Sequence, residues 1–236
     1  MSERRARTLA VVQHVSAEHL GLIEDHFEGR GIRFRYFRPF VEGGRLPGSR
    51  DWADGLVLLG GGSWGATPGP HRLPTLDAEV AMTATALAAG GPILGIGLGA
   101  AILALAAGGT ATPTPLEFAV EEARRTVDDA LDGLLPDRLP MVRYGRDLAR
   151  PPAAADVLAV DPRGDAAVFR CAPRAFGFRG HPGAKSAIVE DLIMDSEDAP
   201  ENPQSALQAL RTQQRSLEDS LVPIMTGLVR CMGLMD

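Results

Sequence analysis

The stretch Pro92–Gly109, PILGIGLGAAILALAAGG, decides the fold. Its first part, Ile93–Ile96, is a short apolar run of the kind found in buried strands, and Leu98–Ala107 is rich in the helix formers alanine and leucine. Only Gly97 separates the two, so the chain must pass from strand to helix in a tight turn. A strand, a tight turn and a helix in direct succession indicate an α/β protein.

The same alternation continues on both sides of this unit. The expected elements before it are strands at Thr8–Val12, Arg33–Phe37 and Gly55–Leu59 and helices at Ala17–Gly29 and Thr75–Ala89. After it, further strands are expected near Met141–Tyr144, Asp156–Val160 and Ala166–Arg170. Strands that alternate with helices in this way are typical of a parallel sheet covered on both faces.

Three motifs then point to a family. Pro92–Gly109 resembles the nucleophile-elbow segment of class I glutamine amidotransferases, whose usual form is PvlGiClGaQllAlalGG. The segment Phe178–Gly183, FRGHPG, is similar to the family's QFHPE motif, and Gly60–Gly62 matches its GGP-type loop. The resemblance covers Thr8–Pro182 and is to GMP-synthase-type glutaminase domains. It implies an α/β, flavodoxin-like three-layer sandwich with a mostly parallel central sheet in residues 1–194, followed by a linker and C-terminal helical extension in residues 195–236.

The residues that carry the family's chemistry are missing. Gly97 stands where the resemblance places the catalytic cysteine, and it has no side chain to attack the amide of glutamine. Gly183 replaces the carboxylate that orients the catalytic histidine, so His181 alone remains of the triad. Ala101 replaces a glutamine, and Tyr144 begins a Tyr-Gly-Arg segment where relatives have an HGD-like stretch. We therefore expect a pseudo-glutaminase that acts as a binding, regulatory or scaffolding subunit through protein contacts.

The resemblance also outlines the former substrate pocket. In the family, the GGP-type loop supplies backbone N–H groups that stabilise the tetrahedral intermediate. Without a nucleophile, no such intermediate is expected to form. The residues expected to line this pocket are those of the loop and its neighbours in the fold: Gly60, Gly61, Gly62, Ser63, Trp64, Leu98, Ala101 and Tyr144.

Two alternatives stay open. Gly95, Gly97 and Ala100 fit a GxGxxA dinucleotide fingerprint between a strand and a helix, which would make the chain a nucleotide-binding protein. Against this, the turn comes several strands into the fold, and Glu117 is the only acidic residue offered for a ribose. The other alternative is an enzyme that uses the pocket around His181 for a different reaction.

The C-terminal segment carries one apolar seam at helical spacing. Its members expected to make contacts are Leu207, Leu210, Leu217, Leu221, Ile224 and Leu228. A partner helix could use this seam, with Gln214 as a polar register residue. Pro223 must kink or break the helix, which favours two helices folded onto their own domain.

Composition excludes several classes of function. A formal net charge of -6 with no basic cluster argues against nucleic-acid binding. Cys171 and Cys231 lack CxxC spacing, and the five histidines show no metal-ligand spacing, so no metal or other cofactor is expected. The N-terminus has no signal-peptide pattern and the chain has no membrane-spanning apolar run, which predicts a cytoplasmic protein. We expect a homo-oligomer or one component of a protein complex.

Overall fold

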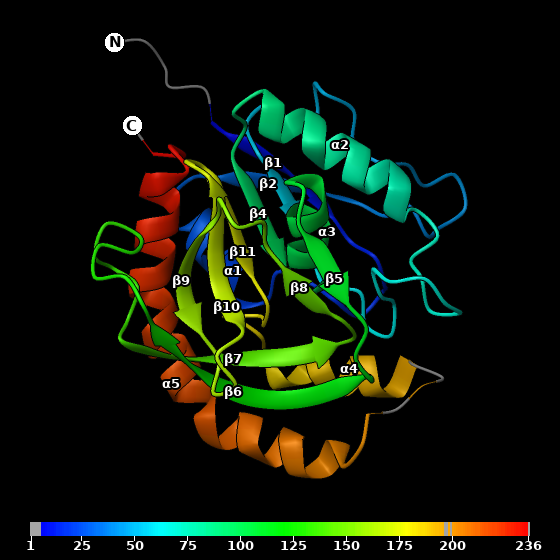
Figure 1. Ribbon diagram of the computed structural model, residues 1–236, viewed down its shortest axis with the longest axis vertical. Coiled ribbons are helices and arrows are strands. Elements are labelled where there is room, and N and C mark those ends of the chain that lie inside the picture. The colour runs from blue at the N-terminus through cyan, green and yellow to red at the C-terminus, as the bar shows by residue number, and fades with distance from the viewer. Residues whose placement is uncertain (1–5, 196–197, 199, 236) are drawn as a thin grey trace.

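A nine-stranded sheet runs through the middle of the protein, in the order β2-β1-β3-β4-β11-β10-β9-β6-β7 (Figure 1). The computed structural model describes residues 6–195, 198 and 200–235. The strands of this sheet are β1 (Thr8–Val12), β2 (Arg33–Phe37), β3 (Leu56–Leu58), β4 (Ile93–Ile96), β6 (Glu117–Arg125), β7 (Arg138–Gly145), β9 (Asp156–Val160), β10 (Ala166–Ala172) and β11 (Ala175–Phe178). A separate pair joins β5 (Thr110–Thr112) and β8 (Leu148–Arg150).

The first five strands of the sheet are parallel, from β2 to β11. Strands β1, β3 and β4 are buried almost throughout, as strands covered on both faces should be. Because parallel strands point the same way, the loops after β1, β3, β4 and β11 meet at one edge of the sheet. The fold class expected from the sequence is confirmed, and this edge holds every motif singled out above.

Antiparallel strands extend the sheet beyond β11. The pairs β11–β10, β10–β9, β9–β6 and β6–β7 are all antiparallel. This part of the sheet comes from the irregular, proline-rich middle of the sequence. Its strands β7, β9 and β10 were expected, whereas β6 was not.

Helices cover both faces. On one face, α1 (Leu22–Glu28) and α5 (Pro203–Cys231) pack on the odd-numbered side chains of β1 through Phe27 and Ile224. On the other face, α2 (Leu76–Ala88) and α3 (Leu98–Ala106) pack on the even-numbered ones. The fifth helix of the described residues, α4 (Ser186–Asp195), packs beside α5. The sheet between its two helical layers gives the three-layer sandwich.

Helix α5 is one element despite Pro223. Figure 1 shows it changing direction part-way along its length, as an internal proline predicts, but the expected break into two helices is absent. Proline at 223 leaves the carbonyl of Asp219 without its helical partner, and because Asp219 is exposed, water can bond that carbonyl instead.

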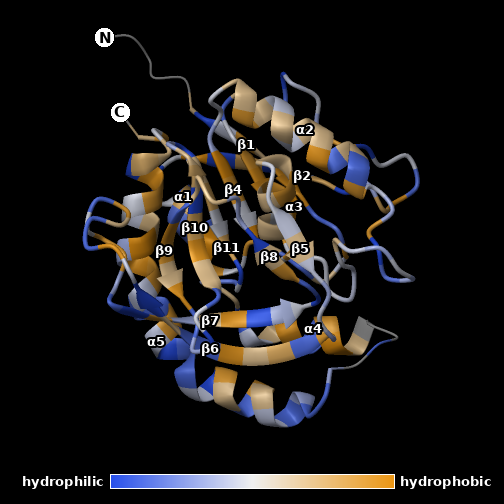
Figure 2. Ribbon diagram, in the orientation of Figure 1, coloured by the Kyte–Doolittle hydropathy of each residue, from blue (hydrophilic) through white to orange (hydrophobic). Residues whose placement is uncertain are grey.

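The apolar seam of α5 faces the protein's own core. The side chains of Leu210, Leu217, Leu221, Ile224 and Leu228 are at most 1% exposed, and Leu207 is partly buried against the same core. Along α5, hydrophilic and hydrophobic colours alternate in Figure 2, as expected for a helix with one buried face. The linker was expected at the start of residues 195–236, and residues 196, 197 and 199 of this segment lie outside the described residues. No helix in the described ranges is long and apolar enough to cross a membrane.

Candidate functional site

The turn between β4 and α3 keeps the backbone shape of a nucleophile elbow. Gly97 has φ 57° and ψ -117°, a conformation that side-chain-bearing residues adopt only with strain of about 1 to 3 kcal/mol. Its N–H donates a hydrogen bond of 2.9 Å to the carbonyl of Phe178 at the end of β11. The elbow is therefore held in place from the neighbouring strand, although the residue at its tip carries no reactive group.

His181 lies beside this turn and uses both ring nitrogens for backbone hydrogen bonds. Its Nδ1 accepts from the N–H of Gly183 at 3.1 Å, and its Nε2–H donates to the carbonyl of His19 at 3.1 Å. Burial lowers the pKa of His181 to about 4, so the ring is neutral near pH 7. No ring nitrogen is left to take a proton from a nucleophile unless one of these bonds breaks.

Packing closes the space beside Gly183, the position where the resemblance led us to expect a carboxylate in other family members. A Cβ atom on Gly183 would lie 2.9 Å from Cδ2 of Leu221 on α5 and 3.2 Å from Cγ1 of Ile23 on α1. Apolar side chains therefore occupy the space that a glutamate at this position would need. The C-terminal helix is part of what closes it.

The glycine loop Gly60–Gly62 follows β3 and faces the elbow. Gly62 has φ 57°, which proline cannot adopt because its ring fixes φ near -65°. The loop thus differs in shape from the GGP pattern that its sequence resembles. Two buried side chains hold it: Glu18 accepts from the N–H of Gly62 at 3.2 Å, and His14 bonds the carbonyl of Gly60 at 2.7 Å.

The two partners of His14 favour its charged, imidazolium form. Its Nδ1 faces the Gly60 carbonyl and its Nε2 faces the Glu79 carboxylate, each at 2.7 Å; a carbonyl and an ionised carboxylate only accept hydrogen bonds. Burial alone lowers the pKa of His14, but the charge and hydrogen bond of Glu79 more than offset this and raise it. Thr75 donates to the other oxygen of Glu79 at 2.6 Å.

Glu18 is a buried carboxyl group next to the elbow. Its side chain lines the same small cavity as Gly97 and His181, and burial raises its pKa to about 7. Sequence reasoning missed Glu18, His14 and Glu79. The signal was present for the first two, because both follow β1 and the loops after parallel strands meet at one edge. Glu79 is an inward-facing residue of α2 and carried no such signal.

The space beside Gly97 is very small. One cavity of about 20 Å³ is lined by Glu18, Gly97, Tyr144 and His181, and a second of about 10 Å³ by Gly61, Gly97, Leu98 and Tyr144. We call these the elbow cavities. A cavity needs roughly 10 to 15 Å³ to hold one water molecule, so each has room for about one. Pockets that take a small-molecule ligand measure about 300 to 1,000 Å³.

The other residues expected at the pocket are divided between two places. Leu98, Ala101 and Tyr144 are buried at or near the elbow. Ser63 lines a different and much larger pocket, and Trp64 lines both that pocket and the smaller elbow cavity. Within the described part of the chain, no group of three His, Cys, Asp or Glu side chains could hold a metal ion.

Solved structures with the same architecture are known. A glutamine amidotransferase from Thermotoga maritima is 22% identical with a TM-score of 0.75, over 97% of this chain and 99% of that one. The chain has the class I glutamine amidotransferase fold. A glutamine amidotransferase from Methylobacillus flagellatus is 20% identical with a TM-score of 0.81, over 96% of each chain. A putative GMP synthase component from Thermoplasma acidophilum is 17% identical with a TM-score of 0.58, over 90% of this chain and 100% of that one.

The likeness extends over the whole glutamine amidotransferase fold, including the segment that contains α5. No known family model and no curated protein matches the sequence. At these identities the structural likeness establishes the fold alone.

Proposed function

We propose that this chain is a catalytically inactive protein of the glutamine amidotransferase fold that serves as a binding, regulatory or scaffolding subunit. The observation that carries the proposal is the elbow itself. Its backbone geometry is kept at φ 57° and ψ -117°, while the residue at its tip, Gly97, has no side chain. A covalent glutaminyl intermediate needs a nucleophile at this place.

Neither cysteine offers a replacement nucleophile. Cys171 lies on β10 and Cys231 near the end of α5, and neither lines an elbow cavity. Burial raises the pKa of each thiol to about 11, which keeps the thiol protonated near pH 7. The thiolate, not the thiol, is the reactive form.

The state of His181 and the small volume of the elbow cavities also support an inactive protein. His181 is neutral and bonded at both nitrogens, and the elbow cavities together have room for only about two waters. The same lack of space disfavours a nucleotide at the Gly95-Gly97-Ala100 turn, because a pyrophosphate must reach the N-terminus of α3. An enzyme with a repurposed site around His181 would need the cavity to open.

A glutaminase assay tests the proposal. The purified chain should release no ammonia from glutamine above a heat-killed control, and Gly97→Cys should not restore release, because His181 stays engaged and Gly183 and Ala101 remain. Gly97→Ala, which carries the same backbone strain without a thiol, is the matched control. Both variants should lose about 1 to 3 kcal/mol of stability. Ammonia release by the unaltered chain would overturn the proposal, and release by Gly97→Cys alone would refute the roles given to His181 and to the elbow cavities.

The proposed binding role requires a partner surface other than the α5 seam, since that seam is buried in the monomer. We propose a homo-oligomer or a complex with another protein in the cytoplasm. Light scattering should then give a mass above the 25.0 kDa of one chain, or co-purification from native extract should give a stable complex. A strictly monomeric, partner-free protein would count against scaffolding.

A further inference from the structure

A pocket much larger than the elbow cavities lies where β1 and β3 end. Its volume is about 620 Å³, within the range of about 300 to 1,000 Å³ of small-molecule sites. The loop after β1 supplies Val15, Ser16 and Ala17, and the loop after β3 supplies Ser63 and Trp64. We call it the switch-point pocket.

Its place in the sheet favours ligand binding. From β1 the chain connects to β2 on one side, and the next strand, β3, lies on the other side. The connections therefore leave in opposite directions between β1 and β3, and the loops diverge there to leave a crevice. In open α/β sheets ligands bind in such crevices, beyond the carboxyl ends of the strands.

Aromatic side chains line the pocket. Phe40, in the loop after β2, is 45% exposed, and Trp64 is half-buried. Two aromatic rings beside a crevice offer faces on which a flat ring can stack. Val15, Ala17 and Leu192 add aliphatic surface.

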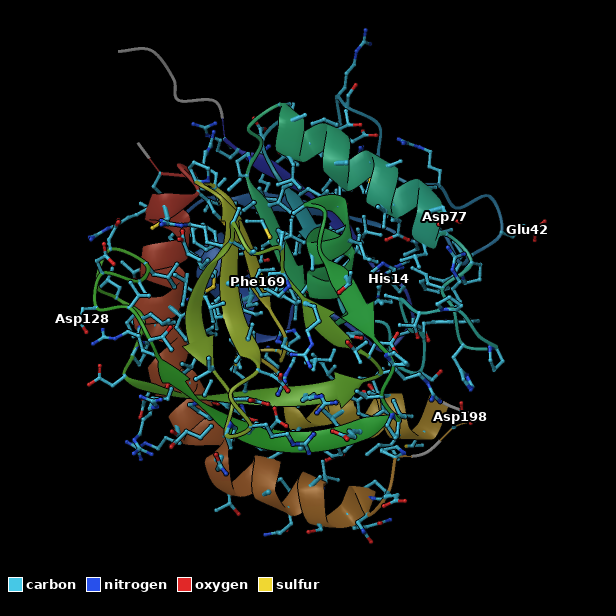
Figure 3. The ribbon with its side chains drawn as sticks, viewed as in Figure 1. His14, Glu42, Asp77, Asp128, Phe169 and Asp198 are labelled. Atoms are coloured by element: carbon cyan, nitrogen blue, oxygen red, sulfur yellow. The ribbon has the colours of Figure 1, made fainter. Side chains whose placement is uncertain are left out.

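The charges at this pocket are already paired. His14, at the pocket, is bonded to Glu79 and Gly60. Nδ1 of His71 lies 3.2 Å from a carboxylate oxygen of Asp198, and a guanidinium nitrogen of Arg146 lies 2.7 Å from the same oxygen. In Figure 3, His14 lies inside the molecule and Asp198 lies at the periphery. Among the described residues that line the pocket, no charged side chain lacks a counter-charge, so an ionic ligand would have to give up water without gaining a partner.

We propose that the switch-point pocket binds an uncharged, planar aromatic or heteroaromatic small molecule. Ser63, which also lines the pocket, carries a hydroxyl group that can hydrogen-bond polar edge atoms of such a ring without charge. The inference does not depend on the loss of glutaminase activity, because neither Gly97 nor His181 lines this pocket. A positive glutaminase assay would leave it standing.

The chain contains two tryptophans, which allows a specific test. Trp52→Phe leaves Trp64 as the single tryptophan of the chain. Trp52 is 8% exposed and packs in the core. The indole N–H resonance of Trp64 is then followed by NMR during titration with indole, benzamide and adenosine. At least one of the three should shift it saturably, with a Kd below about 1 mM. The charged counterparts indole-3-acetate, benzoate and adenosine monophosphate should bind at least about tenfold more weakly, as should non-planar cyclohexanecarboxamide compared with benzamide.

Two neighbouring residues give a matched pair of variants. Phe40→Ala should weaken binding of the responding probe by about tenfold or more, while Val41→Ala should leave it unchanged. Val41 is as exposed as Phe40, at 44%, but does not line this pocket. Both residues lie in a surface loop, so neither change should unfold the protein. The proposal is overturned if none of the three uncharged probes shifts the resonance, if a charged or non-planar counterpart binds equally well, or if Phe40→Ala has no effect.

Discussion

Replacing Glu79 by alanine should destabilise the protein by about 3 to 5 kcal/mol, the cost of removing one partner of a buried ion pair. The side chains of His14 and Glu79 are both 0% exposed. Without the carboxylate, His14 either stays charged with no counter-ion or loses its proton and leaves Nε2 without a partner. Because His14 also holds the carbonyl of Gly60, the glycine loop should loosen in the same variant.

Glu79→Gln separates charge from hydrogen bonding at this site. The amide of glutamine can donate to Nε2 of a neutral His14, while Nδ1–H still donates to Gly60, so every buried group keeps a partner. We therefore expect Glu79→Gln to cost much less than Glu79→Ala. The control is Asp77→Ala on the same helix, whose side chain is 85% exposed and pairs with Arg72 at the surface (Figure 3). In urea denaturation, the free energy of unfolding of Asp77→Ala should stay within about 0.5 kcal/mol of that of the unaltered protein. An equally small change in Glu79→Ala would contradict the imidazolium assignment of His14.

The central parallel strands β1, β3 and β4 were predictable because they are almost wholly apolar. Strands covered on both faces read as continuous hydrophobic runs, and β1 and β4 were located to the residue. Strand β6 was missed for the opposite reason. Its sequence, EFAVEEARR, is mostly charged or half-exposed, and its charged residues are neutralised across the sheet, as where Arg138 on β7 pairs with Glu122. Such ion pairs cannot be predicted from the sequence, because they depend on which strands are neighbours in the sheet.

The candidate site was predictable only where a motif marked it. The elbow, the glycine loop and His181 do meet at one edge of the sheet, as their motifs implied. The buried His14–Glu79 pair joins residues 65 positions apart, and no sequence spacing links them. Local patterns likewise could not show that α5, through Leu221, fills the space beside Gly183.

Glu18→Gln should change how stability depends on pH. The folded-state pKa of Glu18 is about 7, against an ordinary value of 4.5, because burial disfavours its charged form. Between these values the folded protein keeps a proton that the unfolded chain releases, so rising pH costs stability, by about 3 kcal/mol in all. Glutamine carries no such proton. The variant should therefore gain about 3 kcal/mol relative to the unaltered protein as the pH rises from 4.5 to 7.5.

The stability of Glu18→Gln must be compared with that of the unaltered protein at each pH, because the titration of His181 changes stability in the opposite direction. The pKa of His181 is lowered by burial from 6.5 to about 4. Between these two pH values the unfolded chain binds a proton that the folded protein does not, so the folded protein becomes more stable as the pH rises. The two titrations nearly cancel in the unaltered protein between about pH 4.5 and 6.5. Burial lowers the pKa of His14, but Glu79 and, as the smallest of the causes, the charge of Glu18 raise it overall. His14 therefore contributes stability that is present at low pH and lost as pH rises, and most of this contribution remains in Glu18→Gln because Glu79 is its main source.

Urea denaturation at pH 4.5, 5.5, 6.5 and 7.5 measures this difference, with exposed Glu28→Gln on α1 as the control for loss of one carboxylate. Because His181 still titrates in Glu18→Gln, that variant should show a stability that rises clearly from pH 4.5 to 6.5, where the unaltered protein is nearly flat. A difference that stays constant across this range would mean that Glu18 keeps its charge when folded. The elbow cavity would then have to be wet enough to hydrate a carboxylate, and the closed, water-poor site inferred at Gly97 would be wrong.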